Sequence, residues 1–112
     1  MAAVNLTLPV LPGKESQARE LGGKIKQRNK DWETSEKRLR VKKEAWFLQQ
    51  SPQGSMMNVY IEADDIGKVM SDFAKSMDPF DVWLKDEVKA VSGVDLNQPV
   101  GAPPELLFSY GY

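Results

Sequence analysis

The chain of 112 residues contains neither cysteine nor histidine. The absence of cysteine excludes disulfide bonds, thiolate nucleophiles and metal sites built on thiolates. The absence of histidine removes the commonest general base, the commonest metal ligand and the usual haem ligand. Any catalytic chemistry must therefore use carboxylates, tyrosine, lysine, arginine, hydroxyl groups or amides, and we expect no cofactor.

Long apolar runs and a strong charge of one sign are also missing. No stretch approaches the roughly 18 apolar residues that a membrane-spanning helix needs, and the first residues, MAAVNLTLPVLPG, lack the basic start of a signal peptide. The net charge is −1, so the chain as a whole is no general binder of polyanions. We expect one cytoplasmic domain over residues 1–112 that binds neither membranes nor nucleic acid.

Alternation of apolar and polar residues predicts four strands. The first strand has one buried face, made by Val4, Leu6, Leu8 and Val10. The runs EAWFLQQ (residues 44–50) and SMMNVYIEA (residues 55–63) flank SPQG, whose proline and glycine favour a short turn. These two runs therefore predict a β-hairpin, and LLFSYGY (residues 106–112) is the fourth predicted strand.

Apolar residues at helical spacing predict three helices. The row within residues 14–40 comprises Ala18, Leu21, Ile25, Arg28 and Trp32, and the row of the second helix comprises Ile66, Val69, Met70, Phe73 and Met77. The Gly22–Gly23 pair indicates either a close packing contact or a kink. Asp78 as a cap and Pro79 in the first turn predict a third, short helix. Its inward residues are Phe80, Trp83, Leu84, Val88 and Val91.

The order of these elements is that of the ferredoxin-like β-α-β-β-α-β folds, with one extra short helix. We therefore predict an α+β domain whose four-stranded antiparallel sheet carries its helices on one face. On the third strand, the row expected under the helices comprises Met57, Val59, Ile61 and Ala63, and the opposite row comprises Met56, Asn58, Tyr60 and Glu62. On the second strand, we expect Ala45 and Phe47 under the helices.

This arrangement places Trp46 and Leu48 beside Tyr60 on the second face of the sheet. Aromatic side chains on an uncovered face usually mark an interface or a ligand site. Two such sheets packed face to face would form a closed barrel of two chains. The pattern therefore predicts a homodimer.

Several motifs resemble the dimeric α/β-barrel superfamily: the LPGKE turn, the EAWFLQQSPQG hairpin and the IEADD that opens a helix. Within it, the chain is similar to an uncharacterised bacterial family with the patterns PGK, WLQxxPxG, YxEADD, DPFDxWxK, GVDL and PELL. The matching segments cover nearly the whole chain and are Pro12–Lys14, Trp46–Gly54 (with Phe47 inserted), Tyr60–Asp65, Asp78–Lys85, Gly93–Leu96 and Pro104–Leu107.

The resemblance implies a fold more firmly than an activity. The superfamily includes cofactor-independent monooxygenases, polyketide cyclases, haem-degrading proteins and chlorite-dismutase-like enzymes. Its haem branches rely on a histidine ligand, which this chain lacks. Its cofactor-free branches use tryptophan, asparagine, tyrosine or arginine in the barrel, and Trp46, Asn58 and Tyr60 are compatible with that use.

Our leading hypothesis is a homodimer in which each subunit holds a small, mostly hydrophobic or aromatic molecule between sheet and helices. If the protein is an enzyme, it would be a cofactor-independent monooxygenase, cyclase or isomerase. Tyr60 and Glu62 would transfer protons and Asn58 would stabilise an oxyanion. The expected substrate-binding residues are Trp46, Leu48 and Met56. The alternative is a non-catalytic binding or interaction module of the same fold.

The carboxylates of EADD have two interpretations. Glu62, Asp64 and Asp65 could hold Mg²⁺ or Mn²⁺, which prefer oxygen ligands. The simpler interpretation is that one aspartate caps the helix that begins at Ile66 and the other lies in its first turn. We prefer the second, because an amphipathic stripe follows at once.

Basic residues are concentrated in the middle of the chain. Residues 24–43 contain nine basic and three acidic residues, whereas residues 62–87 contain eight acidic and three basic residues. We expect the basic segment to be a solvated face or to pair with the acidic segment, within one chain or across a dimer.

Overall fold

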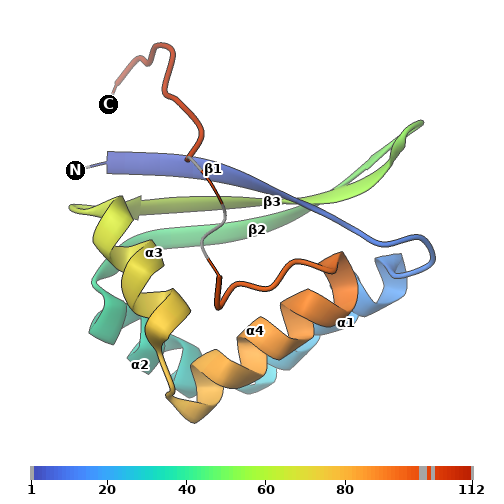
Figure 1. The fold of residues 1–112 in the computed structure, drawn as a ribbon, viewed down its shortest axis with the longest axis horizontal. Coiled ribbons are helices and arrows are strands. Elements are labelled where there is room, and N and C mark those ends of the chain that lie inside the picture. The colour runs from blue at the N-terminus through green and yellow to red at the C-terminus, as the bar shows by residue number, and fades with distance from the viewer. Residues whose placement is uncertain (1, 99–100, 102, 112) are drawn as a thin grey trace.

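The computed structural model describes residues 2–98, 101 and 103–111, which form an α+β fold with one antiparallel sheet and four helices. The elements in chain order are β1 (Ala2–Pro9), α1 (Glu15–Gln27), α2 (Asn29–Leu39), β2 (Val41–Ser51), β3 (Gly54–Ala63), α3 (Ile66–Lys75) and α4 (Pro79–Ser92). The strand order is β1-β3-β2, and the helices lie on one side of the sheet (Figure 1). The predicted α+β class, antiparallel sheet and β-hairpin are confirmed.

The C-terminal segment differs from the prediction. Residues 106–111 form no strand, so the described sheet has three strands, and Tyr112 lies outside the described residues. Leu107 and Phe108 are 81% and 88% exposed. Pro103 and Pro104 precede this segment and have no amide hydrogen to start a ladder. The segment passes β1 and extends beyond the sheet on the side away from the helices (Figure 1).

The helix predicted over residues 14–40 is divided at Arg28. The guanidinium of Arg28 stacks on Phe80 and Trp83 of α4, with 5.0 and 4.5 Å to the ring centroids, and its Nε lies 3.2 Å from a carboxylate oxygen of Asp31. These contacts hold α1 and α2 against α4 at the point where the helix breaks. Gly22 and Gly23 mark neither a kink nor a close contact, because α1 runs through both and a Cβ at either would meet no atom within 4 Å.

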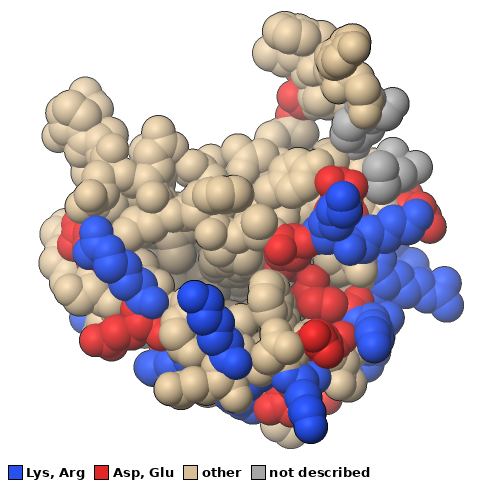
Figure 2. Space-filling model, turned by 180° about the vertical axis from the view of Figure 1, so that it is seen from behind, with Lys and Arg blue, Asp and Glu red and all other residues tan. Residues whose placement is uncertain are grey.

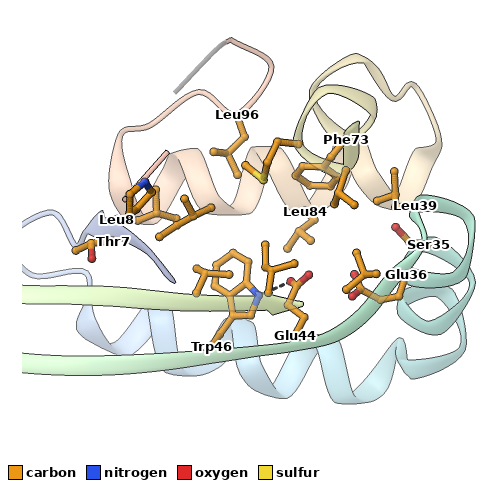
Figure 3. A pocket seen from close by; sticks show the side chains of 17 residues that line it. Thr7, Leu8, Ser35, Glu36, Leu39, Glu44, Trp46, Phe73, Leu84 and Leu96 are labelled. Carbon is orange, nitrogen blue, oxygen red and sulfur yellow. Dashed lines mark hydrogen bonds between the residues drawn. The ribbon is translucent and has the colours of Figure 1, made fainter. Parts of the chain in front are cut away.

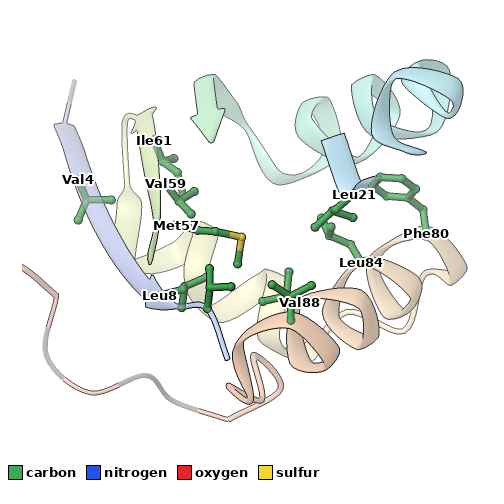
Figure 4. Close-up of a cluster of buried hydrophobic side chains, with 11 residues drawn as sticks. Val4, Leu8, Leu21, Met57, Val59, Ile61, Phe80, Leu84 and Val88 are labelled. Carbon is green, nitrogen blue, oxygen red and sulfur yellow. The ribbon is translucent and has the colours of Figure 1, made fainter. Parts of the chain in front are cut away.

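The core lies between the sheet and the helices (Figure 4). The inward row of β3 is confirmed, since Met57, Val59 and Ile61 are at most 5% exposed and Ala63 is fully buried. The inward residues of α4 are confirmed too, apart from the half-buried Trp83. These residues are Phe80, Leu84, Val88 and Val91.

The helix caps follow the sequence, with one exception in α3. The side chain of Asp65 accepts a hydrogen bond from the backbone of Lys68 (3.0 Å), and that of Asp78 accepts one from the backbone of Phe80 (3.0 Å). Met77 was expected to extend the α3 stripe, but α3 ends at Lys75 and Met77 is 83% exposed. The helix α3 is shorter than predicted because Asp78 caps α4, so the chain must leave α3 and change direction before Asp78.

Two buried charged residues of α4 fasten the helices to one another. Asp81 is fully buried and accepts hydrogen bonds from Ser35 of α2 (2.5 Å), Ser76 (2.5 Å) and Arg38 (2.9 Å). The ammonium group of Lys85 donates to three backbone carbonyls at the end of α3, at 2.9 to 3.2 Å. Lys85 thus supplies donors at a helix end, where C=O groups lack intrahelical partners. The Phe73 carbonyl also accepts from the backbone N–H of Ser76.

The basic segment pairs with the acidic segment inside one chain. Three bridges link the two segments, namely Lys24–Glu87, Arg38–Asp81 (with Asp78 also near Arg38) and Lys42–Asp64. This confirms the expected pairing for part of the basic segment.

Among the described residues, none of the helices combines the length and the apolar character that crossing a membrane would require.

Candidate functional site

A cavity of about 170 Å³ lies between the inward face of the sheet and helices α2, α3 and α4. Its walls are mostly apolar, with Trp46 and Ile61 from the sheet, Met70 and Phe73 from α3 and Leu84 from α4. Figure 3 shows these elements around the cavity. Four lining residues are polar: Ser35 and two glutamates lie near one another, and Thr7 lies at the opposite end (Figure 3).

The two glutamates come from different elements and meet inside the fold. Glu36 projects from α2 and Glu44 from β2, and both point into the space under α4 (Figure 3). The two carboxyl groups lie close enough to interact, and each shifts the pKa of the other. Because two buried carboxylates would repel one another, the pair is most stable when it holds a proton. The pair is called the Glu36–Glu44 dyad below.

Two indole groups hold the dyad in place. Nε1 of Trp46 donates to a carboxyl oxygen of Glu44 (2.6 Å), and Nε1 of Trp32 donates to Glu36 (3.1 Å). Indole can only donate, so each tryptophan fixes one oxygen of its glutamate as an acceptor. The second oxygen of each carboxyl group is left for the shared proton or for a ligand.

Burial sets the proton affinity of the dyad. Burial, followed by the charge of Glu44 and its hydrogen bond, raises the pKa of Glu36 from 4.5 to about 9, and the more distant Asp81 acts in the same direction. Burial also raises the pKa of Glu44, against the lowering effect of its hydrogen bonds with Trp46 and Glu36. A proton therefore resides on Glu36 at neutral pH, beside a second carboxyl group that accepts its hydrogen bond.

Local structure explains how two charged residues come to face the core. Glu36 follows Trp32 by four residues and precedes Leu39 by three, so it lies on the inward face of α2. Arg40 then takes a left-handed conformation (φ 63°) that ends α2, and the β2–β3 register shifts between Val41 and Lys43. The irregularity places both Val41 and Glu44 on the cavity wall, three residues apart.

The register of β2 also corrects the predicted faces of this strand. Trp46 pairs with Val59 and Leu48 with Met57, so Trp46 and Leu48 face the helices. Ala45 and Phe47 point to the uncovered face, where Phe47 is 58% exposed. The prediction of the opposite arrangement was wrong. Both faces of β2 carry apolar residues, so composition alone does not decide which one is inward.

The other predicted site residues lie on the uncovered face, away from the cavity. Tyr60 donates to Glu62 (2.6 Å) and Asn58 donates to Gln49 (2.7 Å) while accepting from Thr7 (3.3 Å). Met56, Asn58, Tyr60 and Glu62 are all half-buried. Trp46 is the one predicted site residue that lines the cavity, while Leu48 lies beside a neighbouring groove under α1.

A larger hollow of about 640 Å³ adjoins the cavity. It lies between β1, α3 and the segment after α4, and it shares several apolar lining residues with the cavity. The shared residues are Leu6, Met70, Phe73, Leu96 and Pro104. The dyad cavity therefore has a wall that borders a more open region.

The EADD carboxylates serve local structure. Asp65 caps α3, as one interpretation predicted. The other aspartate was expected in the first turn, but Asp64 precedes the cap and forms an ion pair with Lys42 (2.8 Å). The hydrogen bond from Lys42, followed by the charge of Lys42, lowers the pKa of Asp64. Within the described part of the chain, no three acidic residues are close enough together to hold a metal ion.

Sequence reasoning missed both members of the dyad. The signal was present in each case as a single charged residue within an apolar row, Trp32-Glu36-Leu39 on the helix and Glu44-Trp46-Leu48 on the strand.

Comparisons with family models, curated proteins and solved structures found no match to this chain.

Proposed function

We propose that this protein binds a small, mostly apolar organic molecule in the cavity and transfers a proton to or from it without a cofactor. One observation carries the proposal: two interacting carboxyl groups lie in the wall of a mostly apolar cavity, each positioned by an indole N–H. Buried carboxyl groups with raised proton affinity are typical of acid–base sites. The fold supplies them from two elements that pack directly against the cavity.

The dyad has a donor and an acceptor in one place. Glu36 holds the proton and can donate it to a bound molecule, and Glu44 can accept one. The indole of Trp46 holds Glu44 in one orientation and also forms part of the apolar wall. The apolar surroundings strengthen interactions between the dyad and polar ligand atoms, because little water is present to screen them.

The cavity suits a molecule of about the size of a substituted benzene. A buried apolar cavity of about 150 Å³ can bind benzene, and this one measures about 170 Å³. Cofactor-independent isomerisation or cyclisation is the class of reaction that fits best, since such reactions need proton transfer alone. The non-catalytic alternative is a binding module that uses the same cavity.

Blocking the cavity is expected to abolish binding. Met70→Trp enlarges a side chain that lines the cavity, and we expect it to weaken the binding of benzyl alcohol at least tenfold. Met77→Trp is the matched control, because it makes the same change at an exposed position. Binding is measured by titration calorimetry and by quenching of tryptophan fluorescence. Equal affinity in the two variants would show that the probe binds elsewhere.

In this proposal the chain also forms a homodimer through the uncovered face of the sheet, as a ferredoxin-like dimeric α/β barrel. Two facts support it. Figure 2 shows the charged side chains gathered over the helices, while the upper part of that view is almost uncharged. The β1-β3-β2 order is also that of a ferredoxin-like sheet whose fourth strand would lie beyond β1. Asn58, Tyr60 and Glu62 would then lie between two sheets, and their catalytic role stays a prediction.

The dimer has a direct test in solution. Light scattering at micromolar concentration is expected to give twice the mass of the chain. Phe47→Asp places a charge on the uncovered sheet face and is expected to give the single-chain mass, whereas Met77→Asp, on the helix side, is expected to leave the dimer intact. A single-chain mass for the unmodified protein would contradict the proposed dimer.

A further inference from the structure

The polar groups of the cavity select a class of ligand by charge. The cavity wall contains two glutamates and no lysine or arginine among the described residues. The guanidinium of Arg38, on the same helix as Glu36, is already bound to Asp81 (2.9 Å) and lies near Asp78 (3.6 Å). An anionic ligand would thus meet like charge in a weakly screened space, and a cationic ligand would meet the opposite charge.

The geometry of the dyad matches an ammonium group. Trp32 and Trp46 each occupy one carboxyl oxygen, and one oxygen of each glutamate remains. An ammonium group has three N–H donors and no acceptor, so it can donate to both remaining oxygens at once. A hydroxyl group has one donor and can satisfy only one of them.

The rest of the cavity suits the apolar part of such a ligand. Trp46 and Phe73 place aromatic rings in the wall, and aromatic faces attract cations as well as apolar groups. Leu84, Val59 and Ile61 provide a surface without polar side chains. A short apolar body next to the ammonium group would therefore displace no polar contact.

Resting on the proposed function, we infer that the ligand is a small apolar primary amine, bound as its ammonium ion between Glu36 and Glu44. The ammonium donates one N–H to the remaining oxygen of each carboxyl group and so replaces the proton that the pair holds. That proton leaves to solvent, so the ammonium cation faces two carboxylates. Binding of an amine therefore releases protons, and binding of a neutral molecule of the same shape does not.

Three probes of one shape and different charge test the inference: benzylamine, benzyl alcohol and benzoate. Titration calorimetry at pH 7 is expected to show benzylamine binding at least tenfold tighter than benzyl alcohol, and benzoate weakest. The heat of benzylamine binding is expected to differ between phosphate and Tris buffers, because the released protons are taken up by buffers of different ionisation enthalpy. The heat of benzyl alcohol binding should not differ.

Single substitutions of glutamate test whether the dyad binds the ammonium group. Glu44→Gln is expected to reduce benzylamine affinity to the level of benzyl alcohol, and its circular dichroism spectrum shows whether the variant is folded. Glu33→Gln is the control, because Glu33 is exposed and lies on the same helix as Glu36, and it should change neither the benzylamine nor the benzyl alcohol affinity. Benzyl alcohol binding as tightly as benzylamine would overturn the amine class and leave the cavity function standing. Failure of all three probes to bind would overturn both.

Discussion

Replacing Asp81 by alanine is expected to lower the free energy of unfolding by about 2 to 4 kcal/mol, since each buried polar group left without its partner costs about 1 to 3 kcal/mol. The side chain of Asp81 is fully buried and joins Ser35, Ser76 and Arg38. Its loss leaves the hydroxyl groups of Ser35 and Ser76 without this acceptor, and an unsatisfied buried hydroxyl group is costly. Arg38 contributes less, because its side chain is 39% exposed and keeps Asp78 nearby. Because stabilities of small domains are about 5 to 15 kcal/mol, this change is a large fraction of the stability of the whole fold.

Urea unfolding followed by circular dichroism measures the effect. Asp86→Ala is the matched control, because Asp86 lies on the same helix and is exposed. We expect it to change the free energy of unfolding by less than about 0.5 kcal/mol. A similar small loss for Asp81→Ala would mean that the network stabilises the fold far less than its burial indicates.

Stability is expected to fall as pH rises from about 5 to 9, and Glu36 is the cause. Its pKa is about 9 in the folded protein against an ordinary value of 4.5. Between these values the folded state holds more protons than the unfolded state, so raising the pH favours unfolding. The contribution of the Glu36 proton to the free energy of unfolding is fully present below pH 4.5 and is lost as the pH rises through 9. One proton corresponds to a slope of up to about 1.4 kcal/mol per pH unit.

The test compares urea unfolding at pH 5.5 and pH 8.0. We expect the unmodified protein to lose about 3 kcal/mol over this interval, as the slope requires. Glu36→Gln, which cannot ionise, is expected to remove most of the loss, whereas Glu33→Gln keeps it. An unchanged pH dependence in Glu36→Gln would show that Glu36 is ionised in the folded protein at neutral pH, against the shared-proton geometry of the dyad.

The DPFDVWLK segment illustrates a pattern that looks functional and proves structural. Asp78 caps α4, Asp81 joins three side chains and Lys85 binds the carbonyl end of α3. The polar residues of this segment thus fix α2, α3 and α4 relative to one another. The same helices form three walls of the dyad cavity, so this network positions the candidate site without lining it with charge.

Local patterns determined which segments become helices and the first three strands. The amphipathic rows around Leu21, Val69 and Val88, the proline-glycine turn of the hairpin and the caps at Asp65 and Asp78 act within a few residues of sequence. Short-range hydrogen bonds and burial of one face are sufficient to specify them. The helix break at Arg28 was harder to predict, because it is stabilised by the aromatic rings of Phe80 and Trp83, which lie more than fifty residues later in the sequence.

Tertiary structure alone decided which residues form the candidate site. The face of β2 depends on a shift in register between Val41 and Lys43, and this shift turns Glu44 and Trp46 towards the helices. Glu36 becomes an acid–base candidate only when α2 packs over β2 and brings it to Glu44, eight residues away in sequence but on another element. Proton affinity depends on burial and on neighbouring charge, and both are properties of the packed fold that no single segment carries.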